Sequence, residues 1–333
     1  MGTPERFSLC GAATLPGTRH MKQRVLVTGG LGYLGGILCE HLLAAGFQVK
    51  ALDNLMYGQG QQGLFHLCAN PDFDFQKGDI RDEALMKGAV RDADSIIHLA
   101  AIVGAAACDR DPLLATSVNF EAVRLLGRLR SPHQLVIYPN TNSGYGITSG
   151  AAFCTEESRL QPISLYGRTK VDAERLLLDA PNTITLRLAT VFGMSPRMRL
   201  DLLVNHFVYV AAKEGYLVIF EKDFKRNFVH VRDVADCMIY CIAHSQRMAG
   251  RPYNVGLEDA NLSKEELARK IQRFVPNFYL HFAPIGQDPD KRNYMVSNER
   301  LREAGFSARR SLEDGIHELL KGYAMEGRGL FRN

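Results

Sequence analysis

Residues 24–36 read Arg-Val-Leu-Val-Thr-Gly-Gly-Leu-Gly-Tyr-Leu-Gly-Gly and decide the fold. The apolar run that ends at Thr28 is typical of a buried strand, and residues 32–45 are typical of a helix. Residues 47–53 then predict a second strand. A strand, a helix and another strand in this order form a βαβ unit, which is the building block of a parallel sheet.

The same alternation continues downstream. Further strands are expected at 73–77, 95–99, 134–138 and 183–188, with helices around 82–90, around 112–130 and across the segment that holds Tyr166 and Lys170. Apolar strands separated by helices indicate a parallel sheet that is covered on both faces. Right-handed crossovers make such a sheet doubly wound. We therefore predict an α/β protein with a Rossmann-type doubly wound parallel sheet over residues 21–190.

Beyond residue 190 the pattern loosens into helices and short strands. These elements are expected at 200–212, 217–220, 232–244, 263–273 and 311–323. We assign residues 191–333 mainly to a smaller C-terminal α/β lobe that binds substrate, and we expect the helix near 232–244 to return to the sheet domain. Residues 1–20 are expected to be a flexible leader or tag, because Met21 directly precedes the first strand.

Composition excludes several classes of protein. The chain of 333 residues is 46% hydrophobic and carries a net charge of +4 that is spread along the sequence, so no nucleic-acid partner is expected. Seven cysteines without a Cys-x-x-Cys pair form neither a disulfide framework nor a zinc pattern, which predicts a reduced, cytoplasmic protein without a metal. Cys237 and Cys241 are expected in the core. No apolar stretch reaches the roughly 20 residues that a membrane helix needs.

Three glycines, Gly29, Gly32 and Gly35, lie between the first strand and the first helix. Absent side chains there let backbone amides, including those of Tyr33 and Leu34, approach a pyrophosphate. Asp53 ends the next strand, where a carboxylate commonly binds the ribose diol of a dinucleotide. A 2′-phosphate would meet a negative charge at that place, so NAD is predicted rather than NADP.

Other residues at strand ends are expected to line the same site. Asn54 follows Asp53, and Asp79 and Ile80 are placed to contact the adenine amino group and ring face. The segment Leu99-Ala100-Ala101 follows the fourth strand, where small residues leave room for the cofactor. His98 stands among apolar neighbours, so we expect it in the core, and Asp82 is interpreted as a helix N-cap.

Tyr166 and Lys170 lie four residues apart in Tyr-Gly-Arg-Thr-Lys and face the same side of a helix. A tyrosine with an unperturbed pKa near 10 is a poor base at neutral pH. The ammonium of Lys170 and an oxidised nicotinamide ring favour the phenolate, which then takes a proton from an alcohol. This is the chemistry of hydride exchange at a carbon that bears oxygen.

Taken together, the chain resembles the extended short-chain dehydrogenase/reductase family, in particular its nucleotide-sugar epimerases and dehydratases. The likeness runs from about Lys22 to Phe306. It rests on the order of several segments: Thr-Gly-Gly-Leu-Gly-Tyr-Leu-Gly-Gly at 28–36, Gly-Asp-Ile at 78–80, His-Leu-Ala-Ala at 98–101, Asn119, Tyr-Gly at 145–146, Tyr-Gly-Arg-Thr-Lys at 166–170 and Arg-Asn-Phe-Val-His-Val-Arg-Asp-Val-Ala at 226–235.

The resemblance implies roles for residues that spacing alone does not assign. The family's catalytic Ser or Thr stands four residues before the Tyr-Gly pair, which is Thr141 here, and Lys170 also holds the nicotinamide ribose. Asn119 is implied to support Lys170 through its helix. Substrate contacts are implied for Thr141, Asn142, Ser143, Asn205, Arg226 and Arg292. A homodimer that forms through two helices per subunit, and a nucleotide-diphosphate sugar as the small-molecule partner, are implied as well; we assign no role to Arg197 or Arg199.

The residues beside Thr141 distinguish among the reactions of this family. A 4,6-dehydratase would carry Asp-Glu directly after the Thr, and a uronic acid decarboxylase would carry Glu at position 143, whereas this chain has Asn142-Ser143. We therefore expect an NAD-dependent epimerase that acts through a transient 4-keto sugar. A 4-ketosugar reductase, a 4,6-dehydratase and a nucleotide-sensing protein without turnover remain as alternatives.

Overall fold

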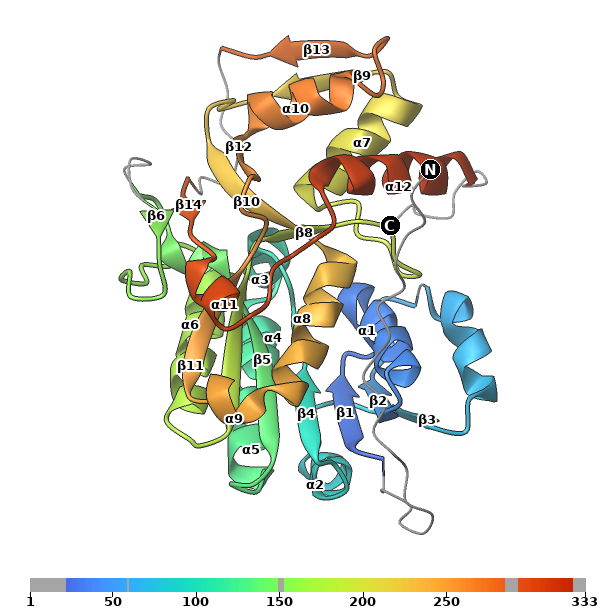
Figure 1. Ribbon diagram of the computed structural model, residues 1–333, viewed down its shortest axis with the longest axis vertical. Coiled ribbons are helices and arrows are strands. Elements are labelled where there is room, and N and C mark those ends of the chain that lie inside the picture. The colour runs from blue at the N-terminus through green and yellow to red at the C-terminus, as the bar shows by residue number, and fades with distance from the viewer. Residues whose placement is uncertain (1–21, 59, 149–152, 285–292, 326–333) are drawn as a thin grey trace, which may run out of the picture.

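Seven parallel strands form the central sheet. The structure is a computed structural model that describes residues 22–58, 60–148, 153–284 and 293–325. Within these residues the sheet order is β11-β7-β5-β4-β1-β2-β3, and every neighbouring pair is parallel (Figure 1). The strands are β1 (Arg24–Thr28), β2 (Gln48–Asp53), β3 (Phe73–Lys77), β4 (Ser95–His98), β5 (Leu135–Thr141), β7 (Thr183–Leu188) and β11 (Arg251–Val255). The predicted fold class is confirmed.

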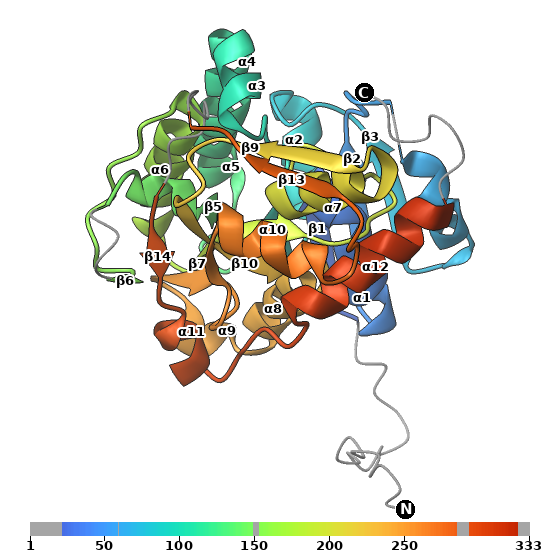
Figure 2. The ribbon, with the colours of Figure 1, turned by 90° about the horizontal axis from the view of Figure 1, so that it is seen from above.

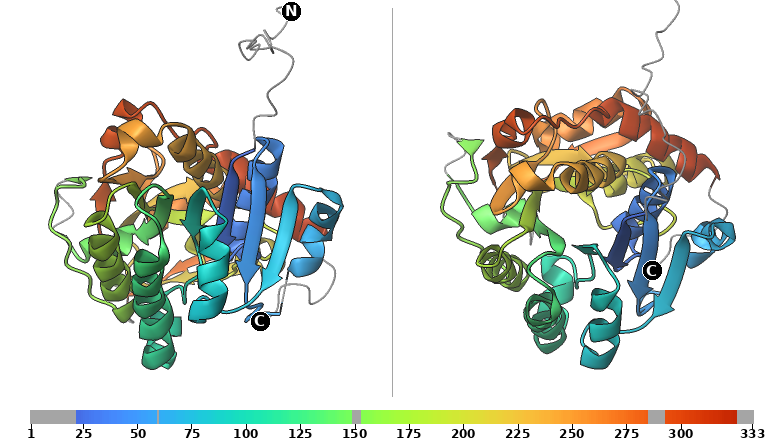
Figure 3. Two further views of the ribbon diagram at one scale, coloured as in Figure 1. Left: turned by 90° about the horizontal axis from the view of Figure 1, so that it is seen from below. Right: turned by 60° about the horizontal axis from the view of Figure 1, so that its bottom comes forward.

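Helices cover both faces of this sheet (Figure 3). On one face α1 (Tyr33–Ala44) packs against α8 (Val231–Ala243); on the other lie α2 (Glu83–Arg91), α5 (Ala122–Leu129) and α6 (Leu165–Leu178). Successive side chains of a strand point to opposite faces, so Val25 and Val27 of β1 enter the first core and Leu26 enters the second. The expectation that Cys237 and Cys241 lie in the core is confirmed, since both are fully buried.

The strand order reverses beside β1. The chain runs from β1 to β2 and β3 on one side of the sheet and then returns to β4 on the other side. In open α/β sheets a crevice forms at the carboxyl ends of the strands at such a switch point. The carboxyl ends of β1 and β4 therefore mark the place where a ligand would enter.

The segment predicted as one helix over 112–130 is divided in the structure. It consists of α4 (Pro112–Thr116), a π-helical turn η2 (Ser117–Glu121) and α5, and α3 (Ala105–Arg110) precedes it. Periodicity did not predict this turn, because one wider turn changes the apolar spacing only slightly. Asn119 lies in the π-helical turn.

A smaller lobe lies beyond the carboxyl ends of the strands (Figures 1 and 2). It contains a three-stranded sheet of β8 (Thr190–Phe192), β10 (Lys225–His230) and β12 (Asn261–Ser263), a two-stranded sheet of β9 (Tyr216–Ile219) and β13 (Tyr279–Phe282), and the helices α7 (Leu203–Lys213), α10 (Lys264–Gln272) and α12 (Leu312–Met325). The remaining elements are η1 (Gln61–Ala69), η3 (Asn142–Tyr145), β6 (Phe153–Cys154), α9 (Ser245–Met248), β14 (Met295–Val296) and α11 (Glu299–Glu303). Because α8 and β11 belong to the sheet layer, the chain crosses between the two parts more than once.

Candidate active site

The turn between β1 and α1 packs closely against its neighbours because its glycines lack side chains. Gly29 has a φ angle of 69°, and a Cβ atom there would lie 2.7 Å from the backbone nitrogen of Ala100. A Cβ atom on Gly35 would lie 2.1 Å from the carbonyl oxygen of Gly29. Gly32 offers no side-chain cap to α1, so the amides of the first helical turn are available to an anion. This cradle fits the pyrophosphate of a dinucleotide.

Asp53 is held in place at the end of β2. Its carboxylate accepts backbone N–H bonds from Leu31 at 3.1 Å and from Leu55 at 2.8 Å. The first of these donors belongs to the glycine turn itself. The carboxylate is therefore fixed beside the phosphate cradle, where the sequence placed a ribose ligand.

Asn54, which follows Asp53 in the chain, connects this residue to Asp79. The side chain of Asn54 is hydrogen-bonded to Asp79, and a side-chain bond from Arg81 is the main cause that lowers the pKa of Asp79 to about 2. Asp79 therefore stays ionised at neutral pH. Ile80 is buried beside it, and Asp82 caps α2, which confirms its interpretation as an N-cap.

His98 ends β4 and belongs to the core. Its Nδ1 lies 3.0 Å from Oγ1 of Thr28, and burial lowers the pKa of His98 to about 3, so its ring is neutral. The same Thr28 hydroxyl oxygen accepts the N–H of Ala100 at 3.3 Å. Leu99 and Ala100 therefore lie against the glycine turn, and their contact with the cofactor stays a prediction.

Tyr166 and Lys170 lie one turn apart on α6. Ser164 caps this helix by accepting the N–H of Gly167 at 3.1 Å, which places Tyr166 in the first turn. Lys170 is 4% exposed, and its Nζ lies 3.8 Å from the centroid of the Tyr138 ring. Burial lowers the pKa of Lys170 to about 7. At neutral pH about half of the Lys170 amines are therefore protonated in this structure. The dry environment makes the charge of the protonated form act strongly on its neighbours.

Thr141 is the last residue of β5, and α6 packs against the turn that follows it. Its hydroxyl donates to Oγ of Ser143 at 2.9 Å and accepts the N–H of Ser143 at 3.1 Å. Asn142 and Ser143 are both buried. Neither amide atom of the Asn142 side chain has a hydrogen-bond partner among the described residues.

A buried ion pair that the sequence did not predict links α6 to the sheet. Glu174 lies one turn after Lys170 and accepts from Nε and Nη2 of Arg187 on β7, with a shortest distance of 2.7 Å. The same carboxylate accepts Nδ2 of Asn140 at 2.8 Å. Asn140 precedes Thr141, so the Glu174 carboxylate fixes β5 and α6 relative to one another. The sequence signal that could have predicted this ion pair is that Glu174 and Arg187 each stand beside apolar residues in a helix and a strand.

The other residues to which the resemblance assigns a role lie in different environments. Asn119 binds both backbone groups of Ile102, at 2.8 and 2.9 Å, and so holds the segment after β4. Asn205 is fully buried, and its amide is bonded to backbone and side-chain groups of the protein. Arg226 is buried on β10. Arg292 lies outside the described residues, as does the leader at 1–20.

Arg199 is a further candidate that sequence reasoning left without a role. Its guanidinium is paired with Asp201, and its side chain is only 15% exposed. It interacts electrostatically with the phenol groups of Tyr166 and Tyr33. Arg199 is therefore a second cation, besides Lys170, that can act electrostatically on the predicted base.

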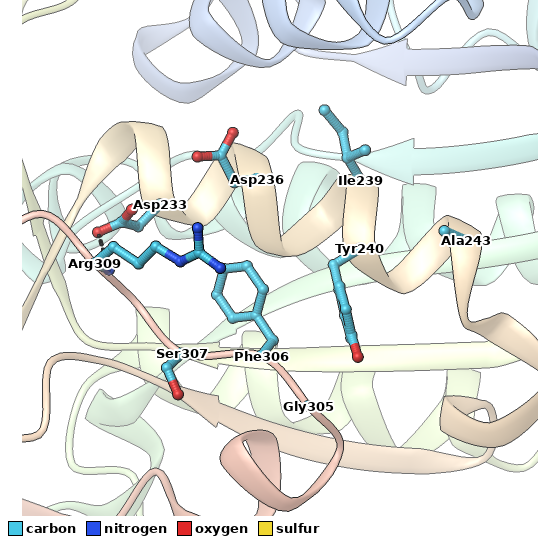
Figure 4. A pocket seen from close by; sticks show the side chains of 9 residues that line it. All are labelled: Asp233, Asp236, Ile239, Tyr240, Ala243, Gly305, Phe306, Ser307 and Arg309. Carbon is cyan, nitrogen blue, oxygen red and sulfur yellow. Dashed lines mark hydrogen bonds between the residues drawn. The ribbon is translucent and has the colours of Figure 1, made fainter. Parts of the chain in front are cut away.

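The cavity between α8 and residues 305–309 has no part in this site (Figure 4). Asp233 and Asp236 of its wall are both paired with Arg310, and Asp236 also pairs with His41 of α1. These charges join the helix layer to the C-terminal segment, which is a structural role.

Along the described part of the chain, no helix is long and apolar enough to cross a membrane.

Comparison with known proteins shows which family this chain resembles. A model of the NAD dependent epimerase/dehydratase family matches residues 25–256. A relative called dTDP-glucose 4,6-dehydratase, from Actinoplanes sp., is 26% identical over 90% of this chain and 97% of its own length. One called UDP-glucose 4-epimerase, from Azospirillum brasilense, is 28% identical over 68% of this chain and 70% of its own length. The crystal structure of UDP-glucuronic acid 4-epimerase from Bacillus cereus, in complex with UDP-glucuronic acid and NAD, superimposes with a TM-score of 0.80 at 22% identity over 91% of this chain and 99% of its own.

Proposed function

Because the chain belongs to the NAD dependent epimerase/dehydratase family, we propose that it is a nucleotide-sugar epimerase that works through a transient 4-keto sugar. The observation that carries the proposal is the buried pair Asn142-Ser143 directly after Thr141. Loss of water from a sugar requires an acid and a base, and neither an amide nor a hydroxyl exchanges protons usefully near neutral pH. The relative called UDP-glucose 4-epimerase supports this choice, and the relative called a dehydratase represents the main competing reaction.

We propose the following roles for the side chains of this site. The charge of Lys170 stabilises the phenolate form of Tyr166, which takes the proton of the C4 hydroxyl and becomes the neutral phenol. Thr141 would turn its hydroxyl away from Ser143, to which it donates in this structure, and donate to the same sugar oxygen. NAD, when bound, supplies reversible hydride acceptance at C4. The glycine turn, Asp53 and Lys170 would hold it, and the protein must let the sugar present its other face before the hydride returns.

Substrate recognition is proposed to depend on arginines and on the turn after β5. Guanidinium groups bind diphosphates through paired hydrogen bonds, and Arg226 and Arg292 are the candidates implied by the family pattern. The buried amide of Asn142 is suited to a sugar hydroxyl. Asn205 is less suited to bind the diphosphate, because its amide is already bonded to Tyr33 and to the backbone.

Isotope exchange separates epimerisation from its competitors. The purified protein is incubated in D2O with UDP-glucose, UDP-glucuronic acid and dTDP-glucose in separate reactions, and the products are followed by NMR. An epimerase returns the same hydrogen to C4, so a C4 epimer without deuterium on carbon is expected. A dehydratase or a decarboxylase incorporates deuterium at C5, and a 4-ketosugar reductase consumes NADH in a parallel reaction that supplies a nucleotide 4-ketosugar. Either of the last two results contradicts the proposal.

A matched pair of variants tests the assigned base. Tyr166→Phe is expected to lower turnover by about 10²- to 10⁴-fold while bound NAD is retained, since only the proton acceptor is removed. Tyr253→Phe is the control, because it removes a buried hydroxyl on β11 that donates to the backbone oxygen of Met248 at 3.3 Å. Unchanged turnover in Tyr166→Phe would exclude this tyrosine as the base.

A further inference from the structure

Tyr33, the first residue of α1, connects the glycine turn to the lobe. Its side chain is buried, and its hydroxyl donates to the carbonyl oxygen of Gly193 at 2.7 Å and accepts from Nδ2 of Asn205 at 3.1 Å. Its own carbonyl oxygen accepts the hydroxyl of Ser195 at 2.6 Å. We call these four residues, Tyr33, Gly193, Ser195 and Asn205, the Tyr33 latch. It joins residues of the turn to residues about 160 positions away in the sequence.

Asn205 extends the latch toward the predicted base. Its Oδ1 accepts the N–H of Gly193 at 3.0 Å, and its Nδ2 also donates to the carbonyl oxygen of Arg199 at 3.0 Å. Arg199 in turn lies near the Tyr166 phenol. A continuous set of hydrogen bonds therefore leads from the first turn of α1 to the backbone oxygen of Arg199, whose guanidinium interacts electrostatically with the Tyr166 phenol.

The latch depends on a hydroxyl in a buried place. Burial raises the pKa of Tyr33, so the phenol stays protonated and keeps its donor role toward Gly193. A phenylalanine would fill the same volume but would leave the Gly193 oxygen without this donor. Buried polar groups that lose a partner destabilise the arrangement that holds them. Removal of the Tyr33 hydroxyl oxygen alone would therefore break the two side-chain bonds that Tyr33 makes in the latch.

We propose that the Tyr33 hydroxyl is a positioning group that couples occupancy of the dinucleotide turn to the order of the loop at 193–199 and, through it, to the placement of Arg199. A pyrophosphate bound by the first-turn amides of α1 fixes the backbone of Tyr33, and the latch passes this restraint to the lobe. Such coupling between two sites is reciprocal, and it is typically about 5- to 150-fold in affinity. The proposal rests on the proposed function only in assigning the lobe to substrate binding.

Hydrogen–deuterium exchange with mass spectrometry tests the coupling without any sugar substrate. The full-length protein is freed of nucleotide and compared with and without saturating NAD. In the wild type, NAD is expected to slow exchange of peptides that cover 193–200 by at least about 5-fold, in addition to its effect on the glycine turn. In Tyr33→Phe the glycine turn should still be protected by NAD, while the effect at 193–200 is lost. Tyr253→Phe should behave as the wild type.

A second variant keeps the test decisive if Tyr33→Phe folds poorly. Ser195→Ala retains the Tyr33 phenol and removes only the bond to the Tyr33 carbonyl oxygen, so the effect of NAD at 193–200 should shrink. The inference is overturned if NAD protects only the turn in the wild type, or if both variants transmit protection as the wild type does. These outcomes do not depend on whether the protein epimerises a sugar, so the proposed function fails or stands separately in the D2O experiment.

Discussion

Replacement of Lys170 by methionine should make the nucleotide-free protein more stable at neutral pH than the wild type. The wild-type ammonium is buried beside Tyr138, and burial lowers the pKa of Lys170 from 10.5 to about 7. At about 1.4 kcal/mol per pKa unit, this difference corresponds to about 5 kcal/mol between the charged and neutral forms. Methionine carries no charge into the site, but it also loses the contact of the ammonium with the aromatic ring, which is about 2 kcal/mol when desolvated. A net gain of a few kcal/mol is expected at pH 7.

The dependence on pH is more diagnostic than the gain itself. The pKa of Lys170 in the folded protein lies below that of the unfolded chain, so between about pH 7 and pH 10.5 the unfolded chain binds more protons. The free energy of unfolding of the wild type therefore contains a contribution that rises by about 1.4 kcal/mol per pH unit in this window and is constant below it. The advantage of Lys170→Met should shrink at the same rate as the pH rises.

Urea unfolding at pH 7, 8, 9 and 10 and constant ionic strength measures this difference. Other groups that titrate in this range are common to both proteins and cancel in the comparison when they are distant from the site. Lys170→Arg is a matched control, because its guanidinium stays protonated throughout: it too should lack the slope, but it should be less stable than Lys170→Met. A difference between Lys170→Met and the wild type that does not change with pH would refute the claim that burial depresses this lysine.

Two further predictions concern the groups around the catalytic pair. Glu174→Gln should lower the free energy of unfolding by about 3–5 kcal/mol, because it leaves Arg187 buried without its carboxylate partner. Asp172→Asn is the control, because it alters an exposed ion pair. It should lower the free energy of unfolding by less than about 1 kcal/mol in the same urea assay. Equal effects would contradict the buried pair's role. Arg199→Met should shift the acidic limb of the kcat/KM profile to higher pH, because a cation near Tyr166 favours the phenolate; an unmoved limb would show that Arg199 does not act on this group.

The sequence predicted those parts of the protein whose causes are local. The strand before Gly29, the turn and the helix after it, and the acid at Asp53 all carry short-range signals, since apolar periodicity and missing side chains leave a mark in neighbouring positions. Tyr166 and Lys170 are also local to one another. Their roles as catalytic residues remain predictions, but their place in the first turns of one helix follows from spacing.

What the sequence did not predict depends on partners that are remote along the chain. Asn205 shows this most clearly: the family pattern implied a diphosphate ligand, and the structure bonds its amide to Tyr33 and Gly193. The residues around position 205 carry no sequence pattern that predicts a hydrogen bond to Tyr33. The π-helical turn at 117–121 was missed for a different reason, because a single wider turn hardly disturbs the apolar pattern.

The residues that position the catalytic groups share one property, which is that each joins elements distant in sequence. Glu174 fixes α6 against β7 through Arg187 and against β5 through Asn140, so Lys170 and Thr141 are located by a single carboxylate. Tyr33 similarly joins the dinucleotide turn to the lobe. A short motif can therefore identify a candidate base and its cation. Buried polar contacts, however, set the positions of that base, the cofactor turn and the lobe relative to one another. Substitutions at these contacts should alter catalysis although the motif itself is unchanged.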